Sequence, residues 1–274
     1  FSLFCDIILY KYRNHCYNGD MKCHNFCNKN AFTLAEVLIT LGIIGVVAAL
    51  TIPVLIANHK KQEVVTKLEK VYTVMNQAIK MSEVENGEVE HWYKDCGLSS
   101  SPTCSTEEVK EWFKTYLGKY INILKIETNE TSTGILIYFN DGSIINMPRY
   151  IYDITYYTNE KAIKNSYRGK NTFLFRFEGN STSAQKKTFD TYSYSWDGTR
   201  EGLVTTSNQY ACSNAENSRR ALCAKLIQYE GWKIPRYYSR DFATLYNVSC
   251  LSLFNLSYIL IISDLKSISL ASVN

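Results

Sequence analysis

The stretch AFTLAE at residues 31–36 leads directly into residues 37–58, a run of 22 positions without a charged side chain. At about 1.5 Å rise per residue, a helix of that length is roughly 33 Å long, enough to cross a hydrocarbon core of about 30 Å. Glu36 lies at the start of this helix, where a carboxylate in lipid is costly. The stretch therefore predicts a membrane helix that separates a short leader from a domain.

Three interpretations of this apolar run compete. A secretory signal peptide has an apolar core of about 7–15 residues followed by a small-residue cleavage site. Here the run is longer, and His59-Lys60-Lys61 follows it without such a site. A plain membrane anchor explains the length of the run but gives no reason for Glu36.

The third interpretation is a resemblance, carried by residues 31–39, AFTLAEVLI. They resemble the prepilin signature of type IV pilins and type II secretion pseudopilins. In that family a dedicated peptidase cuts on the cytoplasmic side of the apolar run and methylates the new amino terminus. The resemblance implies cleavage between Ala31 and Phe32 and N-methylation of Phe32. Ala31 stands where the family usually has glycine, so we expect processing to be slower.

The resemblance also assigns roles to Glu36 and Pro53. It implies that Glu36 pairs with the free amine of Phe32 in a neighbouring subunit, which would couple processing to assembly. Pro53 falls where many family members carry a helix-interrupting proline. Since proline lacks an amide hydrogen, we expect it to kink or locally melt the helix.

The expected function follows from this resemblance: a structural subunit of a type IV pilus or a type II secretion pseudopilus. The implied partners are a prepilin peptidase, further copies and other pilins or pseudopilins in a helical filament, the inner-membrane assembly machinery and membrane lipid. The implied location is the bacterial inner membrane, crossed once, with the globular domain periplasmic or extracellular in a filament. No cofactor is expected.

A minor pilin at a filament tip, binding DNA, a surface or an exported substrate, is the alternative. A DNA-binding protein should expose a clustered basic stripe. The net charge of +4 is spread along the 274 residues and argues against a nucleic-acid partner. One local basic cluster fits either a binding surface or a solvated helix face: Arg219, Arg220, Lys225, Lys233, Arg236 and Arg240. The chain carries no recognisable catalytic motif, so we expect no enzyme and no catalytic residue.

The remaining pattern predicts an α+β, type IV pilin-like fold: a long N-terminal helix, membrane-spanning and then amphipathic, packed on an antiparallel β-sheet. An apolar stripe continues the helix and should end before Gly87; its members are Val64, Leu68, Val71, Tyr72, Met75, Ala78 and Ile79. Ser105 and Glu108 form a candidate capping box for a second helix. Strands are expected at 135–139 and 143–147 around the turn Asn140-Asp141-Gly142, and at 151–157, 172–177 and 188–196. Residues 215–228 are expected to form a short helix.

Cysteines occur on both sides of the apolar run. Two close pairs lie beyond it, Cys96 with Cys104 and Cys212 with Cys223, without histidine or cysteine at zinc-ligand spacing. We interpret both pairs as disulfides, although the spacing leaves other pairings open. Asn171, in the segment Gly169-Lys170-Asn171, replaces the aspartate of a similar pseudopilin pattern, and no acidic cluster surrounds it. We therefore assign no metal site.

The expected organisation is a leader at 1–31, a transmembrane helix at 32–58, a globular domain at 59–242 and a tail at 243–274. Met21 is a candidate start, so residues 1–20 are either upstream translation or part of a longer native leader. The tail is either read-through or disordered, or it adds one strand or helix to the domain.

Overall fold

The computed structural model of the chain describes residues 34–92, 104–129, 134–149, 152–177, 179, 187–205 and 208–234. The predicted cleavage residues Ala31 and Phe32, the predicted disulfide residue Cys96 and the tail at 243–274 lie outside these ranges. Contacts divide the chain into two units, Phe1–Ala48 and Ala49–Asn274.

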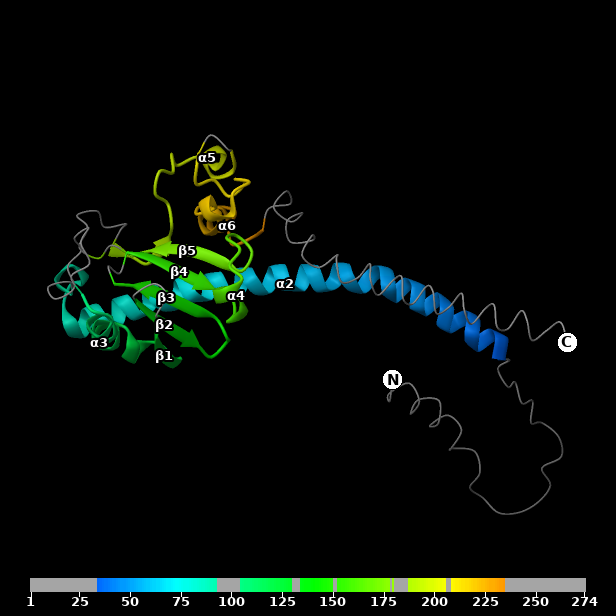
Figure 1. Cartoon of the computed structure of the whole chain (residues 1–274), viewed down its shortest axis with the longest axis horizontal. Helices are drawn as coiled ribbons and strands as arrows, with labels where there is room; N and C mark the ends of the chain where they lie inside the picture. The colour runs from blue at the N-terminus through cyan, green and yellow to red at the C-terminus, as the bar shows by residue number, and fades with distance from the viewer. Residues whose placement is uncertain are drawn as a thin grey trace, which may run out of the picture. The chain divides into compact units, whose positions relative to one another are not determined.

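The second unit is built on one six-stranded sheet in which each strand pairs antiparallel with the next along the chain. Its strands are β1 (Ile123–Asn129), β2 (Gly134–Phe139), β3 (Ile144–Pro148), β4 (Asp153–Tyr157), β5 (Thr172–Arg176) and β6 (Asp190–Thr191). Figure 1 shows the later, cyan part of the long helix α2 (Leu34–Asn86) beside this sheet. The structure thus has the predicted pilin-like α+β fold.

The amphipathic stripe packs as the sequence indicates. Leu68, Met75 and Ala78 are fully buried, and Val71 and Ile79 are nearly so, in one core that also contains residues of β2 to β5. Val64 and Tyr72 lie at the edge of the same core. α2 ends at Asn86, and Gly87 follows with a positive φ of 77°, a conformation that glycine adopts without steric cost.

The second helix, α3 (Thr106–Tyr116), begins with the predicted capping box. Ser105 accepts a hydrogen bond from the Glu108 amide at 3.3 Å, and the Glu108 carboxylate accepts one from the Ser105 amide at 2.6 Å. Burial of Trp112 and Phe113 holds α3 on the core. Two short 3₁₀ helices flank this region, η1 (Val89–His91) and η2 (Gly118–Tyr120).

The hairpin prediction is confirmed by β2 and β3, with Gly142 at φ 77° in the turn. The prediction missed β1. That strand lacks the alternation of buried and exposed side chains that is typical of strands, because its partly buried residues are three positions apart. Its register with β2 also shifts between Ile123 and Lys125. A bulged edge strand of this kind lacks the pattern from which strands are predicted.

Two predicted elements are shorter than expected. The strand expected at 188–196 forms only β6, and Ser195 takes a positive φ of 61° in the turn that follows. The helix expected at 215–228 is replaced by η4 (Asn217–Arg219) and α6 (Cys223–Tyr229), which are separated by Arg220 at ψ 58°, outside the helical range. The structure adds two short helices that were not predicted, α4 (Lys161–Lys164) and α5 (Arg200–Val204).

Candidate functional site

Glu36 lies in the first turn of α2, the helix end at which a negative charge is favoured by the helix dipole. Its side chain is exposed in the single chain. The structure therefore places this carboxylate on a regular helix close to the predicted cleavage point, while Ala31 and Phe32 themselves lie outside the described residues.

The helix after Glu36 presents apolar side chains on all sides. Its most apolar window has a mean hydropathy of 2.6, and none of that window is buried within the chain. Thr40 satisfies its hydroxyl inside the helix by donating to the Val37 carbonyl at 2.9 Å. By length and composition this helix could cross a membrane, where such internal hydrogen bonding is required.

Pro53 lies inside α2, and the helix is continuous on both sides of it. The helix does not melt at Pro53, which was one of the two expected outcomes, and a kink there stays a prediction. Pro53 cannot donate to the carbonyl four residues earlier, but the flanking turns keep their own hydrogen bonds and hold the helical path.

Polar contacts begin immediately beyond the apolar run and connect α2 to the sheet region. Lys67 pairs with Glu63 one turn earlier at 2.9 Å and donates to the Thr158 carbonyl at 3.2 Å. Lys70 pairs with Asp141 of the β2–β3 turn at 2.8 Å. These bonds connect one face of the helix to two loops of the domain.

The carboxylate of Asp141 is the acceptor at the centre of this connection. One oxygen accepts from the Ser143 amide at 3.0 Å and from the Ser143 hydroxyl at 2.5 Å, while the other accepts from Lys70. Partial burial opposes ionisation, but the hydrogen bonds from Lys70 and Ser143 outweigh it and lower the pKa of Asp141.

Asn171 closes the turn before β5 with its side chain. Its amide oxygen accepts from the Tyr167 backbone at 2.7 Å, and its amide nitrogen donates to the Asn165 carbonyl at 2.9 Å. A side-chain amide can make both bonds, whereas an aspartate could make only the first. The residue that departs from the pseudopilin pattern therefore has a structural role here.

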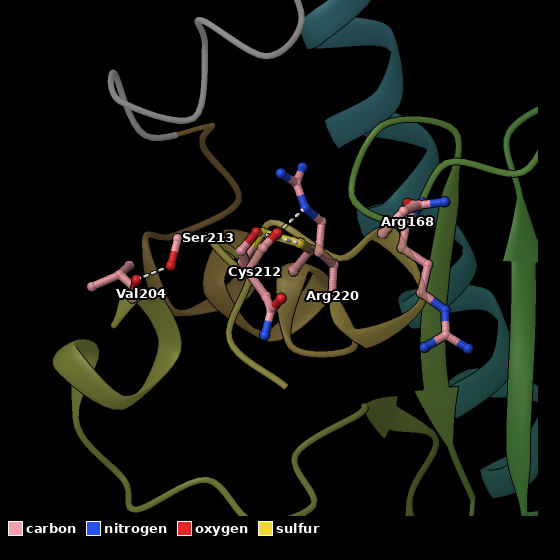
Figure 2. The surroundings of a disulfide bond; sticks show 8 residues. Arg168, Val204, Cys212, Ser213 and Arg220 are labelled. Carbon is pink, nitrogen blue, oxygen red and sulfur yellow. Dashed lines mark hydrogen bonds between the residues drawn. A yellow bond between two sulfur atoms is a disulfide. The ribbon is translucent and has the colours of Figure 1, made fainter. Parts of the chain in front are cut away.

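The Cys212–Cys223 disulfide is present as predicted, with a Cα–Cα distance of 4.6 Å. Figure 2 shows its surroundings: Ser213 hydrogen-bonds the Val204 carbonyl, and Arg220 lies beside the bridge. The bridge joins the loop after α5 to the start of α6 and is buried. Cys104 is also disulfide-bonded, and its predicted partner Cys96 lies outside the described residues.

The basic cluster around α6 does not form one exposed stripe within the described residues. Arg220 is mostly buried and donates to the Asn214 carbonyl at 2.6 Å. Lys225 pairs with Asp190 at 3.1 Å, and Arg219 pairs with Glu216 at 2.8 Å. Arg219 nevertheless stays exposed, as does Lys233, while Arg236 and Arg240 lie outside the described residues.

Among the residues that the structure describes, Glu88, Glu90 and His91 bring potential metal-ligand atoms within 4.8 Å of one another. All three side chains are exposed, and Glu90 is paired with Lys187 at 2.5 Å. Exposed groups of this kind occur commonly without an ion, so they support no metal assignment.

The sequence predicted the turn at Asp141 and the amphipathic part of α2, but not the contact between Lys70 and Asp141 that connects them. Asn76 was missed entirely: its amide binds the backbone of Phe189 in both directions, at 2.7 Å and 3.1 Å. An asparagine beside the apolar stripe is the one signal that could have drawn attention to it.

Comparison with known proteins agrees with these observations. Residues 27–52 match the prokaryotic N-terminal methylation motif, the signature of type IV pilins and pseudopilins. Residues 54–242, more than half of the chain, match a family of unknown function, DUF6613. Searches of curated proteins and of solved structures gave no match. The chain therefore carries the prepilin-type methylation motif and belongs to the DUF6613 family.

Proposed function

We propose that this chain is a prepilin, cut between Ala31 and Phe32 by a prepilin peptidase, methylated at the Phe32 amine, and assembled as a structural subunit of a type IV pilus or a type II secretion pseudopilus. The observation that carries the proposal is the methylation motif at residues 27–52. It overlaps the start of a 53-residue helix whose first part is apolar and exposed.

The chemistry of assembly follows from the position of Glu36. A carboxylate in hydrocarbon is costly unless a positive group pairs with it. Cleavage before Phe32 would create an amine, and the Phe32 amine of a neighbouring copy is the partner that the family resemblance implies. Uncleaved chains lack that amine, so only processed subunits would form the pair.

The exposed apolar face of α2 would supply the rest of the association. Side chains such as Ile39, Ile43 and Val46 are more than half exposed in the single chain. Gly42 and Gly45 have open space around the position of an added Cβ, so a neighbouring helix could approach closely there. The globular domain would then sit outside the membrane in the periplasm or along the filament.

The experiment that tests this proposal is mass spectrometry of the amino-terminal peptide, with the protein isolated from membranes of cells that contain a prepilin peptidase. A peptide that begins at Phe32 and is heavier by one methyl group supports the proposal. A peptide that retains Ala31 and the leader would show that processing does not occur, and the filament function would be rejected.

Glu36 can be tested in the same cells. Glu36→Gln keeps the size and helix propensity of the side chain but removes its charge, so we expect normal processing and loss of filament incorporation. Thr40→Ser, one turn further along, is the matched control and should assemble normally. Normal assembly of Glu36→Gln would contradict the proposed ion pair.

A further inference from the structure

The strand β1 forms one edge of the six-stranded sheet, the lower edge in Figure 1. It pairs with β2 on one side, and within the described residues no backbone hydrogen bond joins it to any other segment. Four of its seven side chains are exposed, those of Leu124, Lys125, Glu127 and Thr128. The open side of such a strand is a template for pairing with another extended chain.

The register of β2 decides which backbone groups of β1 point outward. The Phe139 amide donates to the Ser143 carbonyl at 2.9 Å, which directs the backbone bonds of Phe139 towards β3. Strand residues alternate in this direction, so Tyr138, the residue before it, bonds towards β1. Tyr138 is paired there with Lys125. Every second residue of β1, counted from Lys125, therefore bonds to β2.

The groups that point away from the sheet follow from the same alternation. Lys125 and Glu127 bond to β2, so the N–H and C=O groups of Ile126 and Thr128 point outward. None of these four groups has a hydrogen-bond partner among the residues that the structure describes. An added strand would satisfy them with its own backbone, which is how extended peptides are bound at sheet edges.

Two features restrict which chain can be added at this edge. The register of β1 shifts between Ile123 and Lys125, so regular pairing begins only at Lys125. Lys125 and Glu127 are paired with each other at 2.7 Å, and about half of each side chain is exposed. A bulge and charges on an edge oppose non-specific pairing. The same charges favour a chain that presents the opposite charges in register.

We propose that β1 binds an extended segment of another polypeptide as an added antiparallel strand, and that this segment carries a basic–apolar–acidic triplet. The basic residue would lie opposite Glu127, the acidic residue opposite Lys125 and the apolar residue opposite Ile126. Ile126 is half-buried at the margin of the core, so an apolar neighbour suits it.

The charges lie at the positions where an added strand is read most closely. Ile126 would form a hydrogen-bonded pair with the added strand, which places Lys125 and Glu127 in non-hydrogen-bonded pairs. Opposed Cα atoms in such pairs are only about 4.5 Å apart, so their side chains meet. Opposite charges at these two positions stabilise the pairing, and like charges oppose it.

A second copy of the chain carries the same triplet, Lys125-Ile126-Glu127, but it is not the occupant we infer. Two β1 strands paired antiparallel are related by a two-fold axis perpendicular to the sheet. Since α2 packs against one face of the sheet, that axis reverses the direction of α2. Two copies that insert α2 into one membrane in the same direction cannot pair in this way. The choice of a different polypeptide thus rests on the proposed function, whereas strand addition itself does not.

The test measures binding of fluorescein-labelled peptides to the full chain in detergent by fluorescence anisotropy. The first peptide, Thr-Thr-Lys-Val-Glu-Thr-Thr, has the proposed triplet, and in the second the lysine and glutamate are exchanged. We expect the wild type to bind the first about tenfold more tightly, the effect of two cross-strand charge pairs.

Charge exchange in the protein gives the matched variants. Lys125→Glu combined with Glu127→Lys should reverse the preference between the two peptides. Glu111→Lys combined with Lys114→Glu exchanges an exposed pair on α3 and should leave the preference unchanged. Tryptophan fluorescence checks that each variant is folded.

A second measurement on the wild type tests the backbone bonds. N-methylation of the peptide valine removes the N–H that would bond the Ile126 carbonyl, so we expect about tenfold weaker binding. N-methylation of the peptide lysine removes an N–H that points away from β1, and the affinity should be unchanged. If the charge-exchanged variant is unfolded, this comparison decides alone.

Four results would overturn the proposal. Absence of binding, or equal binding of the two unmethylated peptides, would remove the selective edge. Equal affinity for the two N-methylated peptides would exclude strand addition. A wild type that is dimeric in detergent and becomes monomeric in Lys125→Glu would assign the edge to a second copy. Cleavage before Phe32 is measured separately, so these results reject strand addition without rejecting the proposed function.

Discussion

The reciprocal hydrogen bonds between Asn76 and Phe189 give the most direct test of how α2 is fixed to the sheet. The Asn76 amide donates to the Phe189 carbonyl at 2.7 Å and to the Tyr72 carbonyl at 2.8 Å, and its oxygen accepts from the Phe189 amide at 3.1 Å. Phe189 is fully buried and stacks on Phe175 with ring centroids 4.8 Å apart. We expect Asn76→Ala to destabilise the domain by detaching the segment before β6 from α2.

The magnitude follows from the two bonds to Phe189. Each net hydrogen bond contributes roughly 1 kcal/mol, and each buried backbone group left without a partner adds about 1–3 kcal/mol. Since the segment can partly relax towards water, we expect a loss of about 2–4 kcal/mol in the free energy of unfolding. Asn76→Asp should cost at least as much, because it keeps the bond from the Phe189 amide but places a carboxylate oxygen against the Phe189 carbonyl.

The assay is urea unfolding of the full chain in detergent, followed by tryptophan fluorescence, because Trp92 and Trp112 are buried in the core. Lys80→Ala is the matched control: it lies one turn further along α2, is exposed, and should stay within about 0.5 kcal/mol of the wild type. If Asn76→Ala were as stable as the control, the bonds to Phe189 would not hold the segment in place, and this reasoning would be refuted.

Three further predictions concern separate parts of the domain. Replacing Cys212 and Cys223 with serine should lower the free energy of unfolding by about 3 kcal/mol, the entropy expected for a loop of about 12 residues, and reductant should no longer shift the urea midpoint of this variant through that bridge. Ser105→Ala should cost about 1 kcal/mol through loss of the helix cap, while Ser105→Asp should retain most of the stability. The pKa of Asp141 is lower in the folded state than in the unfolded chain, where it is near 4. The pair with Lys70 therefore stabilises the domain fully at pH values above about 4, and this stabilisation is lost as the pH falls through the lowered pKa of the folded state. Unfolding curves should therefore show a stability difference between the wild type and Lys70→Met at pH 7 that disappears in acid; a difference independent of pH would assign the effect to packing.

The elements that could be predicted from the sequence are those determined by local physics. The stripe that contains Leu68 and Met75 has helical period, the capping box at Ser105 needs only four residues, and the hairpin needs only its turn and two flanking runs. Each of these patterns is complete within a short window, so tertiary contacts could reinforce it without changing it.

The contacts that matter most for the candidate site could not be predicted in the same way. Lys70 and Asp141 are 71 positions apart, and Asn76 and Phe189 are 113 positions apart. Such pairs depend on strand register and on how the helix is rotated against the sheet, neither of which is expressed in any short window. β6 illustrates the limit: a strand was expected over nine residues, but only Asp190 and Thr191 pair with β5.

The long-range contacts of α2 also fix how its amphipathic half is rotated on the sheet. Here the buried stripe, Asn76 and Lys70 each oppose rotation of the amphipathic half against the sheet. Rotation of this half of the helix on the sheet would break the Lys70–Asp141 pair and both Asn76 bonds to Phe189 together, so each contact reinforces the others.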